Sequence, residues 1–255
     1  MDPIIFKVGS IQVTYYALVY IASFLTATFL LLAIRKKELN MKESEVYDLI
    51  ILLVLGLFIG ARIFHVLFWN LDYFSVNPEK ILRIWEGGLS FHGGLLGLFL
   101  AGWFYCKIKK VNFWKIADLF ALLGVLMGTF LRIANFINQE IVGTLTNVSW
   151  CINFKYHEGC RHPVQLYASA GRLILFFILL NIKKKTSKYK EGFIFWLSIF
   201  FLGAGRFLLD FLREDAIHLG LKAGQWFSLI LLAISVIALA QNHKEDIKLL
   251  IKNPK

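Results

Sequence analysis

The sequence predicts an all-α polytopic membrane protein with about seven transmembrane helices, the N-terminus outside and the C-terminus in the cytoplasm. Of its 255 residues, 58% are hydrophobic and 18% are charged, against about 45–50% and about 25% in soluble domains. The mean hydropathy is +0.63. These values exclude a disordered chain, a collagen and an ordinary cytosolic domain. Three cysteines are too few for a disulfide-rich fold.

Seven segments approach the length of about 20 apolar residues that a membrane-spanning helix needs. Three contain no Asp, Glu, Lys or Arg: residues 16–34, 87–106 and 223–242. Four more, whose ends are approximate, are apolar but contain between one and three ionisable residues: 47–69, 115–134, 165–182 and 191–211. The chain shows no internal repeat and no matched pair of broken helices, which argues against a typical transporter. Its first apolar run follows no basic segment, so we expect it to remain as a helix and not to be a cleaved signal.

The basic residues of the loops predict the orientation, because cytoplasmic loops are enriched in Lys and Arg. Alternate loops and the C-terminal tail carry 17 basic residues on one side of the membrane, against eight on the other. The first side is therefore expected to be cytoplasmic, and most of the net charge of +11 reflects topology. No nucleic-acid partner is needed to explain it. We expect one integral-membrane domain over 1–255, with a short extracytoplasmic segment at 144–164.

Ionisable residues inside the predicted spans gather in the outer half of the membrane, and among them only Asp118 lies toward the cytoplasmic side. Arginines outnumber carboxylates there, and only Asp210 and, just beyond the span, Glu140 oppose them. A cationic cluster in a medium of low dielectric needs an anion, and the planar guanidinium suits phosphate. We therefore expect a cavity that holds an anionic lipid headgroup. For single arginines the alternative is a side chain that reaches to the interface. The arginines concerned are Arg62, Arg132, Arg172 and Arg206.

A glycine-rich segment, Gly87-Gly-Leu-Ser-Phe-His-Gly-Gly94, opens the third predicted span. Gly93 and Gly97 have the small-xxx-small spacing that allows close packing of two helices. His92 lies among them, and a neutral imidazole is a suitable base for a thiol. The alternative for His92 is a simple hydrogen bond between helices.

The segment from Leu131 to Gly143 concentrates polar residues at the outer end of the fourth span. Asn135 and Asn138 can donate to phosphate or ester oxygens. Glu140 can orient an arginine or an amide, or accept a proton. If the helix continues, Arg132, Asn135 and Gln139 share one face. The alternative is a polar helix end without further function.

Cys151 and Cys160 both lie in the predicted outer loop, in an oxidising environment. We expect a disulfide between them that closes a small loop just before Arg161. Two alternatives remain at this point, a pair of free thiols and a zinc site completed by His157 and His162.

Together these motifs resemble the prolipoprotein diacylglyceryl transferase family over nearly the whole chain. The resemblance rests on several short motifs: Asp2-Pro-Ile-Ile-Phe, Tyr16, Gly60-Ala-Arg62, the segment around His92, Arg132 to Gly143, Arg161-His-Pro, Arg206 and Gly224-Gln225. The stretch from Arg132 to Gly143 is similar to the family signature. The family transfers diacylglycerol from phosphatidylglycerol to the lipobox cysteine of a prolipoprotein, which forms a thioether and releases glycerol 1-phosphate.

The resemblance implies roles for particular residues. The expected catalytic residues are His92, Arg132, Glu140 and Arg206. Of the expected substrate-binding residues, the resemblance implies Tyr16, Asn135 and Gly143, and position and side-chain chemistry add Arg62, Asn138 and Asp210. Arg206 and Arg132 would hold the lipid phosphate, and His92 would deprotonate the thiol.

The expected partners are phosphatidylglycerol, lipobox peptides and the lipid bilayer, without nucleic acid, metal or organic cofactor. The expected location is the plasma membrane, or the inner membrane of a cell that has two, as a multi-pass protein with its active site toward the outer leaflet. Leu131, Ala168 and Leu202 depart from the family pattern. These departures leave open an inactive paralogue that only binds lipid. The expected arginine cavity would also serve an anionic-lipid transporter or scramblase, which is the second alternative.

Overall fold

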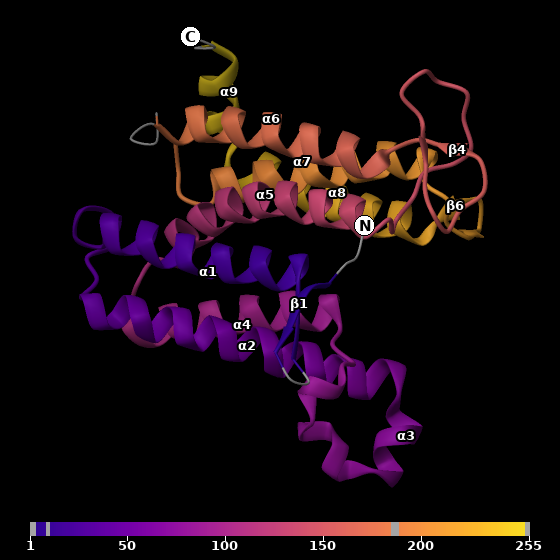
Figure 1. The fold of residues 1–255 in the computed structure, drawn as a ribbon. Helices are drawn as coiled ribbons and strands as arrows, with labels where there is room; N and C mark the ends of the chain where they lie inside the picture. Colours follow the sequence, from indigo (N-terminus) through magenta and orange to yellow (C-terminus); the bar gives the residue numbers. More distant parts are fainter. Residues whose placement is uncertain (1–3, 9–10, 185–188, 253–255) are drawn as a thin grey trace. The chain divides into compact units, whose positions relative to one another are not determined.

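The computed structural model describes residues 4–8, 11–184 and 189–252, and Asp2 and Pro3 of the first motif lie outside this part of the chain (Figure 1). The chain divides into two compact units. One comprises Phe24–Phe113, and the other comprises Met1–Ser23 with Trp114–Lys255. Each unit is built mainly of long apolar helices.

In the described residues, six helices are long and apolar enough to cross a membrane. They are α1 (Tyr15–Ile34), α2 (Glu43–Trp69), α5 (Phe113–Ile137), α6 (Val164–Lys184), α7 (Phe193–Leu209) with the turn η5 (Asp210–Leu212) that extends it, and α8 (Ala223–Asn242). Only helices and closed barrels satisfy all backbone polar groups in lipid. The all-α multi-pass prediction is therefore confirmed.

The seventh expected span corresponds to α4 (Phe91–Lys109), which is not among these six. Its glycines and the terminal Lys107 and Lys109 lower its apolar content. The helix also begins four residues later than expected, because Gly87 and Gly88 adopt φ values of 91° and 75°. Ser90 caps its start, and its hydroxyl accepts a hydrogen bond from the amide of Gly93. The number of crossings and their orientation remain predictions.

Shorter elements connect the long helices. The helical ones are η1 (Arg35–Leu39), α3 (Leu71–Val76), η2 (Pro78–Leu82), η3 (Ile84–Glu86) and α9 (Lys244–Lys252). Three antiparallel hairpins pair β1 (Ile4–Val8) with β2 (Ile11–Thr14), β3 (Ile152–Asn153) with β4 (Cys160–Arg161), and β5 (Ile217–His218) with β6 (Leu221–Lys222).

Within Phe24–Phe113, α2 and α4 pack with their backbones almost in contact. A Cβ atom on Gly93 would lie 2.3 Å from the carbonyl oxygen of Gly60, and one on Gly97 would lie 1.9 Å from that of Gly56. Two pairs of glycines, each four residues apart, thus interlock. This confirms the close packing predicted from Gly93 and Gly97.

In the other unit, α5, α6, α7 and α8 lie side by side around a shared apolar core (Figure 1). Phe193, Ile194 and Leu179 are fully buried at its centre. Asp118 of α5 is also buried, and its carboxylate accepts hydrogen bonds of 2.8 Å from the amides of both Gly192 and Phe195. Asp118 therefore caps the start of α7, which is a structural role for this buried carboxylate.

Candidate active site

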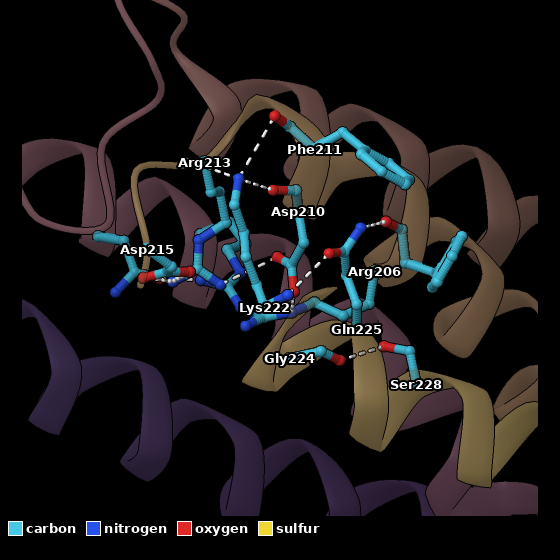
Figure 2. Close-up of polar contacts among 12 residues, drawn as sticks. Arg206, Asp210, Phe211, Arg213, Asp215, Lys222, Gly224, Gln225 and Ser228 are labelled. Carbon is cyan, nitrogen blue, oxygen red and sulfur yellow. Dashed lines mark hydrogen bonds and ion pairs between the residues drawn. The ribbon is translucent and has the colours of Figure 1, made fainter. Parts of the chain in front are cut away.

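The buried carboxylate of Asp210, at the end of α7, organises two arginines (Figure 2). Its Oδ2 atom accepts a hydrogen bond of 2.8 Å from Nε of Arg206, one helical turn earlier. Its Oδ1 atom accepts one of 3.1 Å from Nη1 of Arg213. The side chain of Asp210 has no exposed surface, whereas that of Arg206 is 34% exposed. Asp210 is thus a fully buried anion that holds a partly open cation in place.

The start of α8 packs directly against this ion pair. A Cβ atom on Gly224 would lie 2.1 Å from Oδ2 of Asp210 and 2.7 Å from Nη2 of Arg206, so only glycine fits there. Figure 2 also shows Lys222, whose buried ammonium donates to the backbone carbonyls of Asp210 and Arg213. Lys222 therefore closes the η5 turn without competing for the carboxylate.

Arg206 keeps donors available for a ligand. Its Nε is held by Asp210, and within the described part of the chain its two Nη groups have no hydrogen-bond partner. Arg172, Arg206 and Arg213 lie close enough for their charges to repel that of Arg132. Within the described residues, Arg172 has one hydrogen-bond partner, the carbonyl oxygen of Gly128, which accepts from Nη1 at 2.8 Å. Positive charge therefore exceeds negative charge in this cluster, as the sequence predicted, and the arrangement can bind an anion.

A second network joins the end of α5 to the start of α1. Asn135 accepts a hydrogen bond of 3.0 Å from Nη1 of Arg132 through its Oδ1 atom. Its amide nitrogen donates to the hydroxyl of Tyr16 and, at 3.2 Å, to Oε1 of Glu140. Asn138 donates to the same Oε1 atom, also at 3.2 Å. Of the two kinds of partner considered for Glu140, an arginine and an amide, the structure shows the amides.

This network fixes the orientation of Asn135. Asn135 is 4% exposed, and both its oxygen and its nitrogen have protein partners. Burial raises the pKa of Glu140 above its ordinary value of 4.5. The buried Nε atom of Arg132 has no hydrogen-bond partner in the described residues, so one donor of this arginine is unsatisfied beside Asn135. An acceptor atom supplied by a ligand would satisfy it.

The expected shared face of Arg132, Asn135 and Gln139 is wrong. Helix α5 ends at Ile137, and Gln139 adopts a φ of 56°. Its side chain turns away and accepts a hydrogen bond of 2.6 Å from the amide of Lys155. Gln139 thereby connects the end of α5 to the outer hairpin.

Gly143 lies where three chain segments meet. Its amide donates to the carbonyl of His162 at 3.2 Å, and its carbonyl accepts from Nη1 of Arg161 at 3.1 Å. The guanidinium of Arg161 is buried and also pairs with the carboxylate of Glu214. Arg161 therefore holds the segment after α5 against the segment after α7.

The outer hairpin contains the predicted disulfide between Cys151 and Cys160, whose Cα atoms are 5.4 Å apart. The bond leaves neither thiol to bind zinc. Cys160 pairs with Asn153 in the hairpin, and Arg161 follows immediately. The disulfide prediction is confirmed. The loop that the bond closes ends directly before Arg161, which donates to the carbonyl of Gly143.

His92 belongs to the other unit, on the first turn of α4, and its side chain is exposed. It lines a cavity of about 540 Å³ together with His65, Trp69, Asn70, Leu89 and Ser90. Nε2 of His65 lies 2.9 Å from the amide nitrogen of Asn70, so this imidazole is oriented by a neighbour on the same wall. A thiol or a lipid headgroup has room to approach His92.

Arg62 has partners that its position in the sequence did not suggest. All five of its N–H donors are directed at backbone carbonyls of residues 80–88. The side chain is 6% exposed, and its guanidinium lies 4.9 Å from the ring centre of Phe74. The predicted binding of substrate by Arg62 would have to replace bonds that the protein already makes.

Three contributors to these networks were not among the predicted site residues: Arg213, Arg161 and Lys222. The spacing of Arg206, Asp210 and Arg213, at i, i+4 and i+7, is a helical one that could have indicated Arg213. No local signal indicates Lys222 or Arg161, because their partners are backbone carbonyls or residues far away in the chain. Leu202, one of the departures from the family pattern, packs against the apolar core.

The model of the family described as prolipoprotein diacylglyceryl transferase matches residues 3–241. The chain belongs to this family. It is 37% identical to the phosphatidylglycerol–prolipoprotein diacylglyceryl transferase of Geobacter sulfurreducens, over 96% of this chain and 97% of the relative. It is 38% identical to the enzyme of that name from Mannheimia succiniciproducens, over 97% and 96% of the two chains. For the Pasteurella multocida protein the identity is 40%, over 89% and 85%.

The match to the prolipoprotein diacylglyceryl transferase family includes both units of the structure, and with them the arginine cluster, the Glu140 network and the cavity beside His92. The resemblance derived from the sequence motifs is thereby confirmed.

Proposed function

We propose that this protein transfers the diacylglyceryl group of phosphatidylglycerol to the cysteine thiol of a prolipoprotein lipobox, the first step of lipoprotein maturation. One observation carries the proposal. Arg206 is held through Nε by the buried Asp210, while its Nη groups remain without described partners inside a cluster in which positive charge exceeds negative charge. A fixed guanidinium with a free edge is suited to a phosphate diester.

The reaction joins the thiol sulfur to the glyceryl carbon that bears the phosphate. The thiol proton goes to a base, a carbon–sulfur bond forms, and the carbon–oxygen bond to the phosphate breaks. The leaving oxygen keeps the electron pair, so glycerol 1-phosphate departs with an additional negative charge. Cationic donors aimed at that charge stabilise the transition state more than the ground state.

In this proposal Arg206 and Arg132 bind the phosphate, and Asp210 orients Arg206. Glu140 holds the amides of Asn135 and Asn138, and Tyr16 holds Asn135 from the other side. Gly143 keeps the connection after α5 close to His162.

His92 is the proposed base for the thiol, whose ordinary pKa of about 8.5 leaves it largely protonated at neutral pH. Its exposure on the wall of a cavity supports access by a thiol. For Arg62, the backbone partners favour a role other than the predicted binding of substrate.

We further propose that the protein resides in the plasma membrane, or in the inner membrane of a cell that has two, with its active site toward the outer leaflet. The excess of basic residues in alternate loops supports an external N-terminus. The Cys151–Cys160 disulfide supports an external position for residues 144–164, because cytoplasmic thiols are kept reduced. The partners would be phosphatidylglycerol and lipobox peptides within the bilayer; neither a nucleic acid nor a cofactor is part of the proposal.

The test is an assay of the purified protein with a lipobox peptide in vesicles that contain phosphatidylglycerol. Transfer gives a peptide of reduced gel mobility and an equal amount of glycerol 1-phosphate. The matched control is the same peptide with serine in place of cysteine, which should remain unmodified. Movement of unmodified lipid between leaflets without release of glycerol 1-phosphate would instead support a transporter. Lipid binding without either result would support an inactive paralogue.

A further inference from the structure

Arg62 makes an unusual set of contacts within the unit formed by Phe24–Phe113. Its Nε donates to the carbonyl of Ile81 at 2.8 Å, and its Nη2 donates to that of Lys80 at 2.6 Å and of Arg83 at 3.4 Å. Its Nη1 donates to the carbonyls of Gly87 and Gly88 at 2.6 and 2.9 Å. A single side chain of α2 thus donates to five backbone carbonyls of the connecting segment 80–88.

The physical reason lies in the shape of that segment. In the last turn of η2 the carbonyl of Lys80 accepts from the amide of Arg83 at 3.1 Å as well as from Arg62, and the carbonyl of Ile81 accepts from Arg62. The Gly87–Gly88 turn, at positive φ, presents two more carbonyls to the same guanidinium. Such groups are costly to bury without donors. A guanidinium offers five donors in one plane, and the carbonyl dipoles in turn stabilise its charge. An ammonium could not reach all five oxygens.

The same face of α2 fixes the start of α4. The amide of Ser90 donates to the carbonyl of Ala61 at 3.0 Å, directly beside Arg62. Three residues on, the backbone of Gly93 lies against that of Gly60. His92 lies between these two contacts, so the position of its backbone depends on consecutive residues of α2.

We infer that Arg62 is a positioning residue for His92: it clamps residues 80–88 and thereby sets the orientation in which α4 presents the imidazole to the cavity it shares with His65. This inference replaces the predicted binding of substrate by Arg62. It rests on the proposed transferase function, in which His92 is the base.

The first experiment compares Arg62→Gln and Arg62→Lys with the unsubstituted protein in transfer assays and in hydrogen exchange. We expect kcat to fall by about 10- to 100-fold for both variants, as for other small displacements of catalytic groups, while KM for phosphatidylglycerol changes less than about twofold. The amides of residues 84–93 should exchange faster in both variants without any lipid present. The pH dependence of kcat should shift in Arg62→Gln, because His92 would be displaced.

A second pair of variants avoids removing the buried cation. A Cβ atom on Gly88 would lie 2.7 Å from Nε2 of His65 and 2.8 Å from Nη1 of Arg62, whereas one on Gly87 would meet no atom within 4 Å. Both glycines have positive φ, and Gly87, with a ψ of −161°, lies in a region that essentially only glycine occupies. Gly87→Ala therefore reports the effect of backbone strain in this turn without a clash with Arg62 or His65. Gly88→Ala should reproduce the decrease in kcat expected for Arg62→Gln. The decrease in log kcat for Gly87→Ala should be less than half as large.

Two results would overturn the inference. One is a rise in KM for phosphatidylglycerol at unchanged kcat and unchanged hydrogen exchange in Arg62→Gln, which would make Arg62 a lipid ligand. The other is equal behaviour of the Gly87→Ala and Gly88→Ala variants. Failure of the transferase proposal is distinguishable, because it would leave the unsubstituted protein inactive while the hydrogen-exchange comparison remains informative about the clamp.

Discussion

Asp210 binds Arg206 through a hydrogen bond of 2.8 Å between Oδ2 and Nε, and it does so without any exposed surface of its own. The geometry fixes one edge of the guanidinium and leaves the other available. Because the second oxygen of Asp210 engages Arg213, the carboxylate has no remaining freedom to rotate. The orientation of Arg206 is therefore set by the protein before any lipid binds.

Asp210→Asn should lower kcat/KM for transfer by about 100-fold or more, because breaking a buried pair leaves arginines uncompensated and misdirects an oriented donor. The matched control is Asp215→Asn, since Asp215 is 37% exposed and touches only Arg213 of this group. Steady-state assays with the lipobox peptide give the comparison. Equal activity of the two variants would contradict the orienting role of Asp210.

Arg206→Ala should reduce transfer to background while the protein still inserts and folds, because the phosphate loses its fixed cationic partner. Arg206→Lys should recover only part of the activity, since an ammonium cannot offer a planar pair of donors. Arg35→Lys is the control, because among the described residues the guanidinium of Arg35 pairs with the exposed carboxylate of Glu43 and donates to the carbonyl of Leu32, and it contacts no member of the arginine cluster. Turnover near that of the unsubstituted protein in Arg206→Ala would exclude the phosphate-binding role.

His92→Gln should lower kcat much more than it weakens lipid binding, and the deficit should shrink as the pH rises toward the thiol pKa of about 8.5. The reason is that a thiol which ionises in solution no longer needs a base. His218→Gln, at an exposed position outside the cavity, serves as the control. A deficit that is independent of pH would indicate a structural or lipid-orienting histidine.

The protonation of Glu140 should make the transfer activity depend on pH in the acidic range. Burial raises its pKa, so it takes up a proton at a higher pH than an ordinary glutamate does. We expect activity to fall as the pH drops through this raised pKa, since the proton removes the charge that orients Asn135 and Asn138.

The variant Glu140→Gln should lose about five- to tenfold in kcat at neutral pH, because charged hydrogen bonds are worth about 1 kcal/mol more than neutral ones. Its pH profile should lack the acidic limb. Glu158→Gln, in the exposed part of the outer hairpin, should leave the profile as it is. If the acidic limb persisted in Glu140→Gln, the group that titrates there would be a residue other than Glu140.

The Cys151–Cys160 disulfide should contribute about 2–3 kcal/mol to the stability of the folded protein, the value of the chain-entropy model for so short a loop. A reducing agent should therefore lower the melting temperature of the unsubstituted protein. The double variant Cys151→Ser, Cys160→Ser should melt at the lower temperature under both conditions. Labelling of both thiols in the folded, non-reduced protein would disprove the bond.

The sequence by itself determined the helices, because only a helix satisfies its own backbone polar groups within lipid. The spans expected at 16–34 and 223–242 became α1 and α8 with ends that agree to within one residue. The excess of arginine over carboxylate, and hence the need for an anion, also follows from composition and depth alone.

The tertiary structure alone decided which partners these side chains have. Nothing local indicates that Arg62 would meet carbonyls 18 to 26 residues away, because that depends on how residues 80–88 fold back over α2. Likewise Gln139 left the expected helical face when α5 ended at Ile137. The period of a helix predicts neighbours within one element, whereas hydrogen bonds between distant segments depend on where loops direct their carbonyls, and only the packed chain fixes that direction.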